Sequence, residues 1–175
     1  MLDNLRMILN LRSMESFPLS ALLRMVHIAA IVHWIGGVAF VTTVLLPAVA
    51  KRVSAEDRVH FFEEVESRFA TQARISTALA GISGFALLWQ MNAWGRLLSP
   101  HYWWLHGMIA VWLIFTLMLF VFEPLFLHRW FLERARRDPA GTFRLVQRMH
   151  WILLGISTVV TLGAAAGAHG WLWFR

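Results

Sequence analysis

Four long apolar segments, separated by charged connections, constrain most strongly what this chain can fold into. They run over about 22–46, 75–94, 102–127 and 151–174. Each reaches the roughly 20 residues that a helix needs to cross ~30 Å of hydrocarbon. The sequence therefore predicts an all-α protein, an integral membrane four-helix bundle that forms a single membrane domain over residues 1–175. A weakly amphipathic stretch over 1–17 is expected to lie at the membrane surface.

The composition supports a membrane protein and excludes several kinds of site. The chain is 58% hydrophobic and its mean hydropathy is +0.58, whereas soluble domains are about 45–50% apolar. It has no cysteine, which excludes disulfides, iron–sulfur clusters and the covalent attachment of c-type haem. The net charge is +6, but the basic residues flank apolar segments and no nucleic-acid motif occurs. The lipid bilayer, not nucleic acid, is therefore the expected partner.

The distribution of Lys and Arg predicts how the chain crosses the membrane. The first and third connections hold eleven of these residues, whereas the termini and the second connection together hold five. Basic residues accumulate in cytoplasmic loops. Both termini are therefore expected on the periplasmic side of a bacterial inner (plasma) membrane, in a multi-pass topology.

Four histidines lie inside or at the ends of the apolar segments: His27, His33, His106 and His169. An ionisable side chain at membrane depth marks a functional site by default, and imidazole is the commonest protein ligand for haem iron and many metals. Counting from the centres of the segments places His27, His106 and His169 about 12–13 Å outward of the midplane. Their shared depth predicts a metal centre that holds haem b, with copper as the alternative.

The expected axial ligands are His27 and His106, and His169 is the substitute for either. Two histidines saturate haem iron, which favours electron transfer over oxygen activation. His33 lies about 120° around the helix from His27 and is expected to serve another partner. Three further histidines are interpreted as solvated interfacial side chains, and the role of a fourth stays open. The three are His60, His101 and His128, and the fourth is His150.

Small residues and one carboxylate add to this interpretation. Gly36-Gly37 and the run 163–168 leave room beside histidines, either for a porphyrin or for close helix packing. Glu123 precedes Pro124 and is expected to form an interfacial ion pair or, as the alternative, to carry protons. Its expected partners are Arg74, Arg144 or Arg148. Three methionines are interpreted as packing residues, with copper or haem ligation as the alternative: Met91, Met108 and Met149.

The first apolar segment carries a pattern in which Trp follows His by seven residues, Gly follows three later and an aromatic residue three later again. The matching residues are His27, Trp34, Gly37 and Phe40. This pattern resembles the first helix of the superfamily of CopD (copper-resistance D) and HemJ-type membrane proteins. The resemblance implies a four-helix membrane protein that binds haem or handles copper, and it adds Trp34 and Gly37 to the cofactor-binding residues.

HemJ-type members are haem-binding protoporphyrinogen oxidases with a functional helix-one His and helix-three Lys. The position of that Lys falls on Met108 here, which argues against the oxidase activity and leaves His106 as the partner of His27. The expected function is that of a membrane cytochrome b-like haem protein in electron transport, an oxidoreductase if it is an enzyme. A quinone or a redox protein is the expected partner, and other membrane subunits would complete a larger redox complex. A CopD-like copper transport or accessory protein, a HemJ-like porphyrin oxidase and a bundle subunit without a cofactor are the alternatives.

Overall fold

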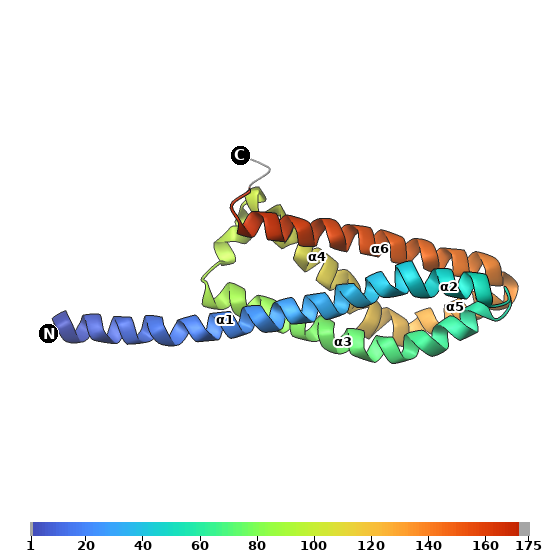
Figure 1. Ribbon diagram of the computed structural model, residues 1–175, viewed down its shortest axis with the longest axis horizontal. Helices are drawn as coiled ribbons and strands as arrows, with labels where there is room; N and C mark the ends of the chain where they lie inside the picture. Colours follow the sequence, from blue (N-terminus) through green and yellow to red (C-terminus); the bar gives the residue numbers. More distant parts are fainter. Residues whose placement is uncertain (1, 172–175) are drawn as a thin grey trace.

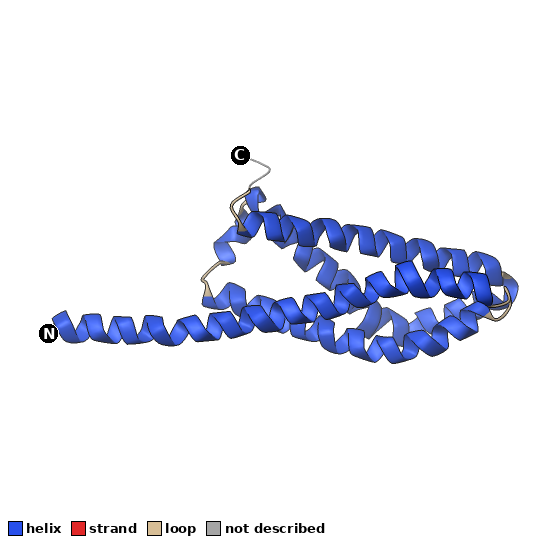
Figure 2. Cartoon of the chain, viewed as in Figure 1, coloured by secondary structure: helices blue, strands red, loops and turns tan. Residues whose placement is uncertain are grey.

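The computed structural model describes residues 2–171, apart from the side chains of residues 2–18, Phe126 and His128. This part of the chain is helical and contains no strand (Figure 2). The elements are α1 (Leu2–Phe40), the π-helix η1 (Val41–Leu45), α2 (Leu46–Arg52), α3 (Arg58–Gln90), the 3₁₀ helices η2 (Trp94–Leu98) and η3 (Pro100–Tyr102), α4 (Trp103–Leu117), the π-helix η4 (Met118–Leu127), α5 (His128–Arg137) and α6 (Pro139–Ala168).

Three helical stretches are long and apolar enough to cross a membrane: Leu19–Arg52, Pro100–Leu125 and Pro139–Ala168. This confirms the prediction of an all-α chain with helices able to span a bilayer. The second predicted segment, 75–94, lies mostly in α3, whose first half is charged, and α3 is not one of these three. The interfacial role predicted for 1–17 stays a prediction, because those side chains lie outside the described part.

The four longest elements run side by side along the long axis of the molecule (Figure 1). α1 packs along α3 and α4 packs along α6, while further contacts join α3 to α4 and α1 to α6. α2, α5 and the beginnings of α3 and α6 lie together at one end. α1 begins, and α6 ends, at the opposite end.

Besides the start of α1, which runs unbroken from Leu2 through Pro18, two helix boundaries differ from the sequence-based expectation. The first segment was expected to end near residue 46, just before Pro47, yet the helix continues to Arg52. Proline cannot donate a backbone hydrogen bond and crowds the preceding turn. The π-helical turn η1 widens the helix just before it, with the Leu46 N–H bonded to the carbonyl of Val41. At the other boundary α6 begins at Pro139, where Asp138 accepts a hydrogen bond from the Gly141 N–H (2.8 Å), and it ends at Ala168. Residues 172–174 of the predicted fourth segment lie outside the described residues.

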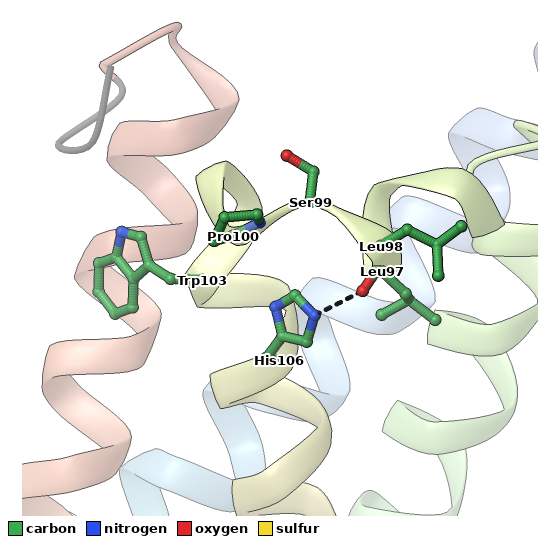
Figure 3. Close-up of a pocket in the computed structure, with 6 residues that line it drawn as sticks. All are labelled: Leu97, Leu98, Ser99, Pro100, Trp103 and His106. Atoms are coloured by element: carbon green, nitrogen blue, oxygen red, sulfur yellow. Dashed lines mark hydrogen bonds between the residues drawn. The ribbon is translucent and has the colours of Figure 1, made fainter.

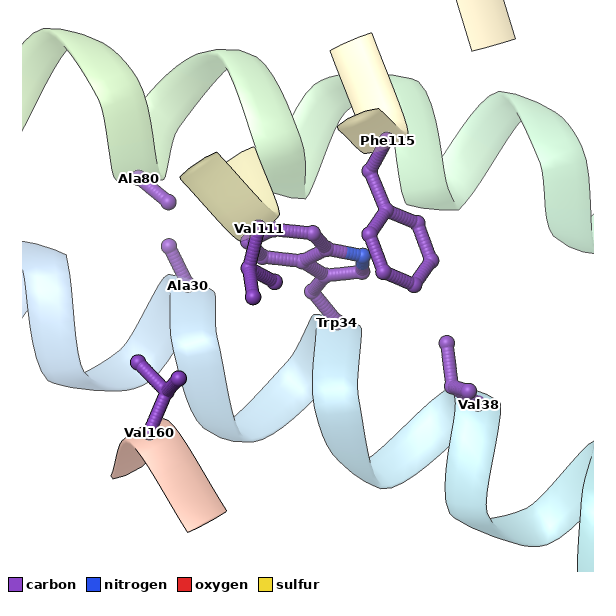
Figure 4. Packing of buried hydrophobic residues seen from close by; sticks show 7 residues of the cluster. All are labelled: Ala30, Trp34, Val38, Ala80, Val111, Phe115 and Val160. Carbon is purple, nitrogen blue, oxygen red and sulfur yellow. The ribbon is translucent and has the colours of Figure 1, made fainter. Parts of the chain in front are cut away.

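Two apolar clusters form the core. The first lies near the middle of the bundle and draws on all four long helices: Ala30, Trp34, Val38, Ala80, Val111, Phe115 and Val160 (Figure 4). Within it the rings of Trp34 and Phe115 meet edge to face, with centroids 4.8 Å apart. The second lies at the end that holds α2 and α5: Val41, Leu46, Val49, Val59, Phe62, Phe143 and Val146. These clusters fix the register of the helices, and with it the depth of each histidine.

Candidate functional site

His27 is the histidine that α1 presents to a neighbouring helix. Its ring is half-buried, and Nδ1 lies 2.9 Å from the carbonyl oxygen of Ala80 and 3.1 Å from Oγ of Ser83, both on α3. A carbonyl oxygen only accepts, so Nδ1 carries the proton and Nε2 keeps its lone pair. A Cβ at Gly84 would lie 3.0 Å from Cε1 of this ring, so glycine makes room for it. Nε2 has no hydrogen-bond partner among the residues described.

His106 lies on α4 at the edge of the connection that follows α3. Nδ1 is 3.1 Å from the carbonyl oxygen of Tyr102, and Nε2 is 2.9 Å from that of Leu97 (Figure 3). The ring is exposed and lines an open cleft of about 450 Å³ together with Leu97, Leu98, Ser99, Pro100 and Trp103. A neutral imidazole donates from only one nitrogen, so the lone pair of the other nitrogen of His106 faces a carbonyl oxygen and is not open to a ligand in this conformation.

Three further histidines, His169, His150 and His33, bond within their own helix or at the surface. His169 follows the end of α6, is exposed and donates from Nδ1 to the carbonyl of Ala165 (2.8 Å). His150 bonds the carbonyl of Val146 in the same way (2.9 Å), and its ring meets Phe62 edge to face. The exposed His33 pairs with Gln72, so it contacts the same helix as His27, α3, but has a different partner there.

The register of the helices gives the relative depth of the three predicted ligands. Val160 occupies the notch at Gly107 and belongs to the same cluster as Ala30. Ala30, Gly107 and Val160 are therefore taken as one layer of the bundle. At a rise of ~1.5 Å per residue, His106 lies about 1.5 Å outward of this layer, His27 about 4.5 Å and His169 about 13 Å. His27 and His106 therefore share a depth to within about 3 Å. His169 lies further out because nine residues at the end of α6 separate it from Val160.

Of the glycines predicted to leave space, Gly37, Gly163 and Gly167 are packed against aromatic rings, whereas nothing lies within 4 Å of the position that a Cβ would take at Gly36. Phe69 faces Gly37, Trp112 faces Gly81, Trp103 faces Gly163 and Trp104 faces Gly167, each so close that a Cβ would clash. Of the two roles left open for the small residues, close packing is the one seen at these positions. Trp34 is likewise buried against Phe115, so both motif residues, Trp34 and Gly37, contact protein side chains.

The described residues offer few ligands for a metal ion or a haem. No group of three or more His, Asp or Glu side chains that could hold a metal ion occurs in the described part of the chain. The residues fit one imidazole ligand, His27, whose proton is on the nitrogen that faces α3. The described residues do not place a second free imidazole nitrogen beside His27. Met108 packs against the first cluster, and Met91 accepts a contact from Arg24 (3.7 Å).

A second polar site lies where α3 meets η4. Arg74 donates from Nε to the carbonyl of Leu119 (3.0 Å), and its Nη2 lies 3.1 Å from Oε2 of Glu123. The ion pair predicted for Glu123 is thereby confirmed, with Arg74 as the partner. The contact with Leu119 was not anticipated. In a π-helix the N–H of each residue bonds the carbonyl five residues earlier, and Pro124 has no N–H to give to Leu119. Arg74 supplies the missing donor.

Glu66 lies near this site on α3, outside the three candidate spans. Burial, followed by the negative charges of Glu123 and Glu63, raises the pKa of its carboxyl to about 7. The group therefore holds its proton at a higher pH than an ordinary glutamate does. The sequence offered no signal for this, because Glu66 falls on a mixed stripe of apolar and acidic residues.

No family model matches the chain, and no curated protein or solved structure is significantly similar to it.

Proposed function

We propose that this chain is a membrane cytochrome b-like protein, a four-helix integral membrane bundle that binds haem b through His27 and transfers electrons. The observation that carries the proposal is the state of His27. A histidine that ligates a metal usually donates its other ring N–H to a carbonyl or carboxylate. His27 donates from Nδ1 to Ala80 and leaves Nε2 open, inside a helix able to span the membrane.

His106 is the proposed second ligand, since its depth lies within about 3 Å of that of His27. To ligate, it would release the carbonyl of Leu97 or of Tyr102. His169 remains the substitute. When bound, haem supplies one-electron redox chemistry, and the chain's own contribution is to hold the His27 ring in one tautomer against α3. A quinone or an external redox protein is the proposed partner, and a larger redox complex is the proposed setting.

Two related activities remain as alternatives through the proposed membership of the CopD and HemJ-type superfamily. The support for membership is the helix-one pattern, in which Trp34 and Gly37 pack on the α3–α4 side together with His27. Met108 stands where HemJ-type oxidases carry Lys, which favours electron transfer over porphyrin oxidation. The copper alternative would need further ligands beside His27.

The purified protein is expected to be coloured. With haem bound through histidine, it should show a Soret band and a sharp α-band on reduction. Because the chain has no cysteine, acid–acetone should extract all of the pigment. A colourless protein from haem-replete cells would contradict the proposal. Stoichiometric Cu(I) binding by such a preparation would favour the copper alternative, and oxidation of protoporphyrinogen would favour the oxidase.

α3 is proposed as the fourth membrane-spanning helix. Its large apolar residues form an exposed stripe at helical spacing: Ile75, Leu79, Ile82, Phe85 and Trp89. Its buried face carries small residues instead: Ala73, Ser76, Thr77, Ala80 and Gly81. Large apolar groups outside and small residues at the helix contacts are typical of a helix in lipid. An exposure of 68% for Ile82 and 78% for Trp89 would be unfavourable in water.

We expect both termini to face the periplasm of a bacterium, because eleven Lys and Arg residues lie in the first and third connections against five elsewhere. A C-terminal alkaline phosphatase fusion should then be active in cells, and a C-terminal green fluorescent protein fusion should be dark. The opposite pair of results would place His27 in the cytoplasmic half of the membrane.

A further inference from the structure

Positive charge is unevenly distributed at the end of the molecule that holds α2 and α5. Residues 128–148 contain six arginines and two acidic residues, whereas residues 51–69 contain four basic and five acidic residues. Both stretches lie at this same end (Figure 1). The excess of positive charge is therefore confined to α5 and the beginning of α6.

The two acidic residues of 128–148 are already engaged. Glu133 pairs with Arg137 (2.6 Å), and Asp138 caps α6 by accepting from the Gly141 N–H (2.8 Å). Five exposed arginines remain, which we call the arginine surface: Arg129, Arg134, Arg136, Arg144 and Arg148. No acidic side chain of the described residues forms an ion pair with any of them, so their charges are available to a ligand.

The position of α5 brings this surface to the depth of lipid head groups. α5 begins three residues after the end of the candidate span Pro100–Leu125. Phe131 and Ala135 pack on the second core cluster and hold α5 against the bundle. Trp130 is exposed beside Arg134, whose guanidinium lies 5.7 Å from the ring centroid, and Trp151 is exposed on α6 beyond Arg148. Exposed Trp next to basic residues is typical of the boundary between hydrocarbon and head groups.

We propose that the arginine surface binds the phosphate groups of anionic phospholipids. Guanidinium groups match phosphate oxygens in pairs, and clusters of basic residues beside membrane helices attract anionic lipid. The adjacent apolar span and the exposed Trp130 and Trp151 favour a lipid over an acidic protein, because both place the arginines at the membrane boundary. This proposal does not depend on the haem.

The test uses the full chain, delipidated in a neutral detergent. The protein is titrated with phosphatidylglycerol or with phosphatidylcholine, and native mass spectrometry counts the bound lipid molecules. At low salt we expect phosphatidylglycerol to bind about tenfold more tightly or better, since each basic residue near an anionic surface adds to the attraction. The preference should fall at 0.5 M salt (roughly 3–5 Å screening length). The variant Arg134→Gln/Arg144→Gln/Arg148→Gln should lose it, and Arg134→Gln alone, which leaves α6 unchanged, should weaken it even if the triple variant misfolds.

Arg96→Gln is the matched control. Arg96 is also exposed and lies over an aromatic ring, that of Tyr102 (5.4 Å), but it belongs to the connection between α3 and α4, away from the arginine surface. It should keep the full lipid preference. Equal binding of the two lipids, or an unchanged preference in the folded triple or single variant, would overturn the proposal. So would displacement of phosphatidylglycerol by millimolar inorganic phosphate or by polyglutamate, which would assign the surface to a free anion or to an acidic protein.

Discussion

We expect His27→Ala to abolish the haem spectrum of the purified protein while leaving its helical content unchanged. The variant removes the half-buried imidazole whose Nδ1 contacts the carbonyl of Ala80 on α3 and whose Nε2 is left open. The structural cost is small, because one hydrogen bond to a backbone carbonyl contributes about 1 kcal/mol. The loss of pigment would therefore report loss of the ligand. Absorbance at the Soret maximum per mole of protein, with circular dichroism on the same sample, is the measurement.

His33→Ala is the matched control on the same helix, since its exposed ring pairs with Gln72. It should keep the spectrum of the unsubstituted chain. His106→Ala should convert a six-coordinate low-spin spectrum into a five-coordinate high-spin one. If His169→Ala produces that conversion while His106→Ala does not, His169 is the second ligand. Retention of full haem by His27→Ala would contradict the proposed function.

The helices were more predictable from the sequence than their ends. Long apolar runs are a local signal, so the segments containing Trp34, Phe115 and Val160 were identified from composition alone. The continuation of the helix through Pro47 was not predicted, because proline normally ends a helix. The wide π-helical turn η1 accommodates this proline, and no local sequence pattern indicates such a turn. The early start of α6 was missed for a related reason, since its first turns are charged although they pack on the second cluster.

The site was predictable as a set of residue types and not as a set of contacts. His27 attracts attention in any apolar segment, but its bond to Ala80 joins residues 53 positions apart and depends on the register of two helices. Gly163 is a similar case. Its small size is evident from the sequence, but the sequence does not show that the Trp103 ring fills the space beside it. Glu123 was paired with three candidate arginines from charge alone. Only the packing of α3 against η4 selects Arg74.

We expect Arg74→Ala to destabilise the fold more than the loss of any other single arginine with an ion pair in the described chain. Its Nε satisfies the carbonyl of Leu119, which Pro124 cannot reach with a donor of its own. A fully buried acceptor left without a partner costs about 1–3 kcal/mol, and the part-buried carbonyl of Leu119 should lie in the lower part of that range. The ion pair with Glu123 is about one third exposed and adds less than about 1 kcal/mol. Arg137→Ala is the control, because its pair with Glu133 is largely exposed and should contribute within about 0.5 kcal/mol.

A double-mutant cycle with Pro124→Ala separates the two contributions of Arg74. Alanine at position 124 restores an N–H that can donate to Leu119, so Arg74→Ala should cost less in that background, by an interaction energy of about 1 kcal/mol or more. Arg74→Lys should recover the ion pair but not the hydrogen bond, because one ammonium replaces the two separate donors of the guanidinium. Thermal unfolding in detergent measures each variant. Arg74→Ala could instead lower the stability equally with proline and with alanine at position 124. That result would show that Arg74 does not compensate for the proline and that other contacts stabilise η4.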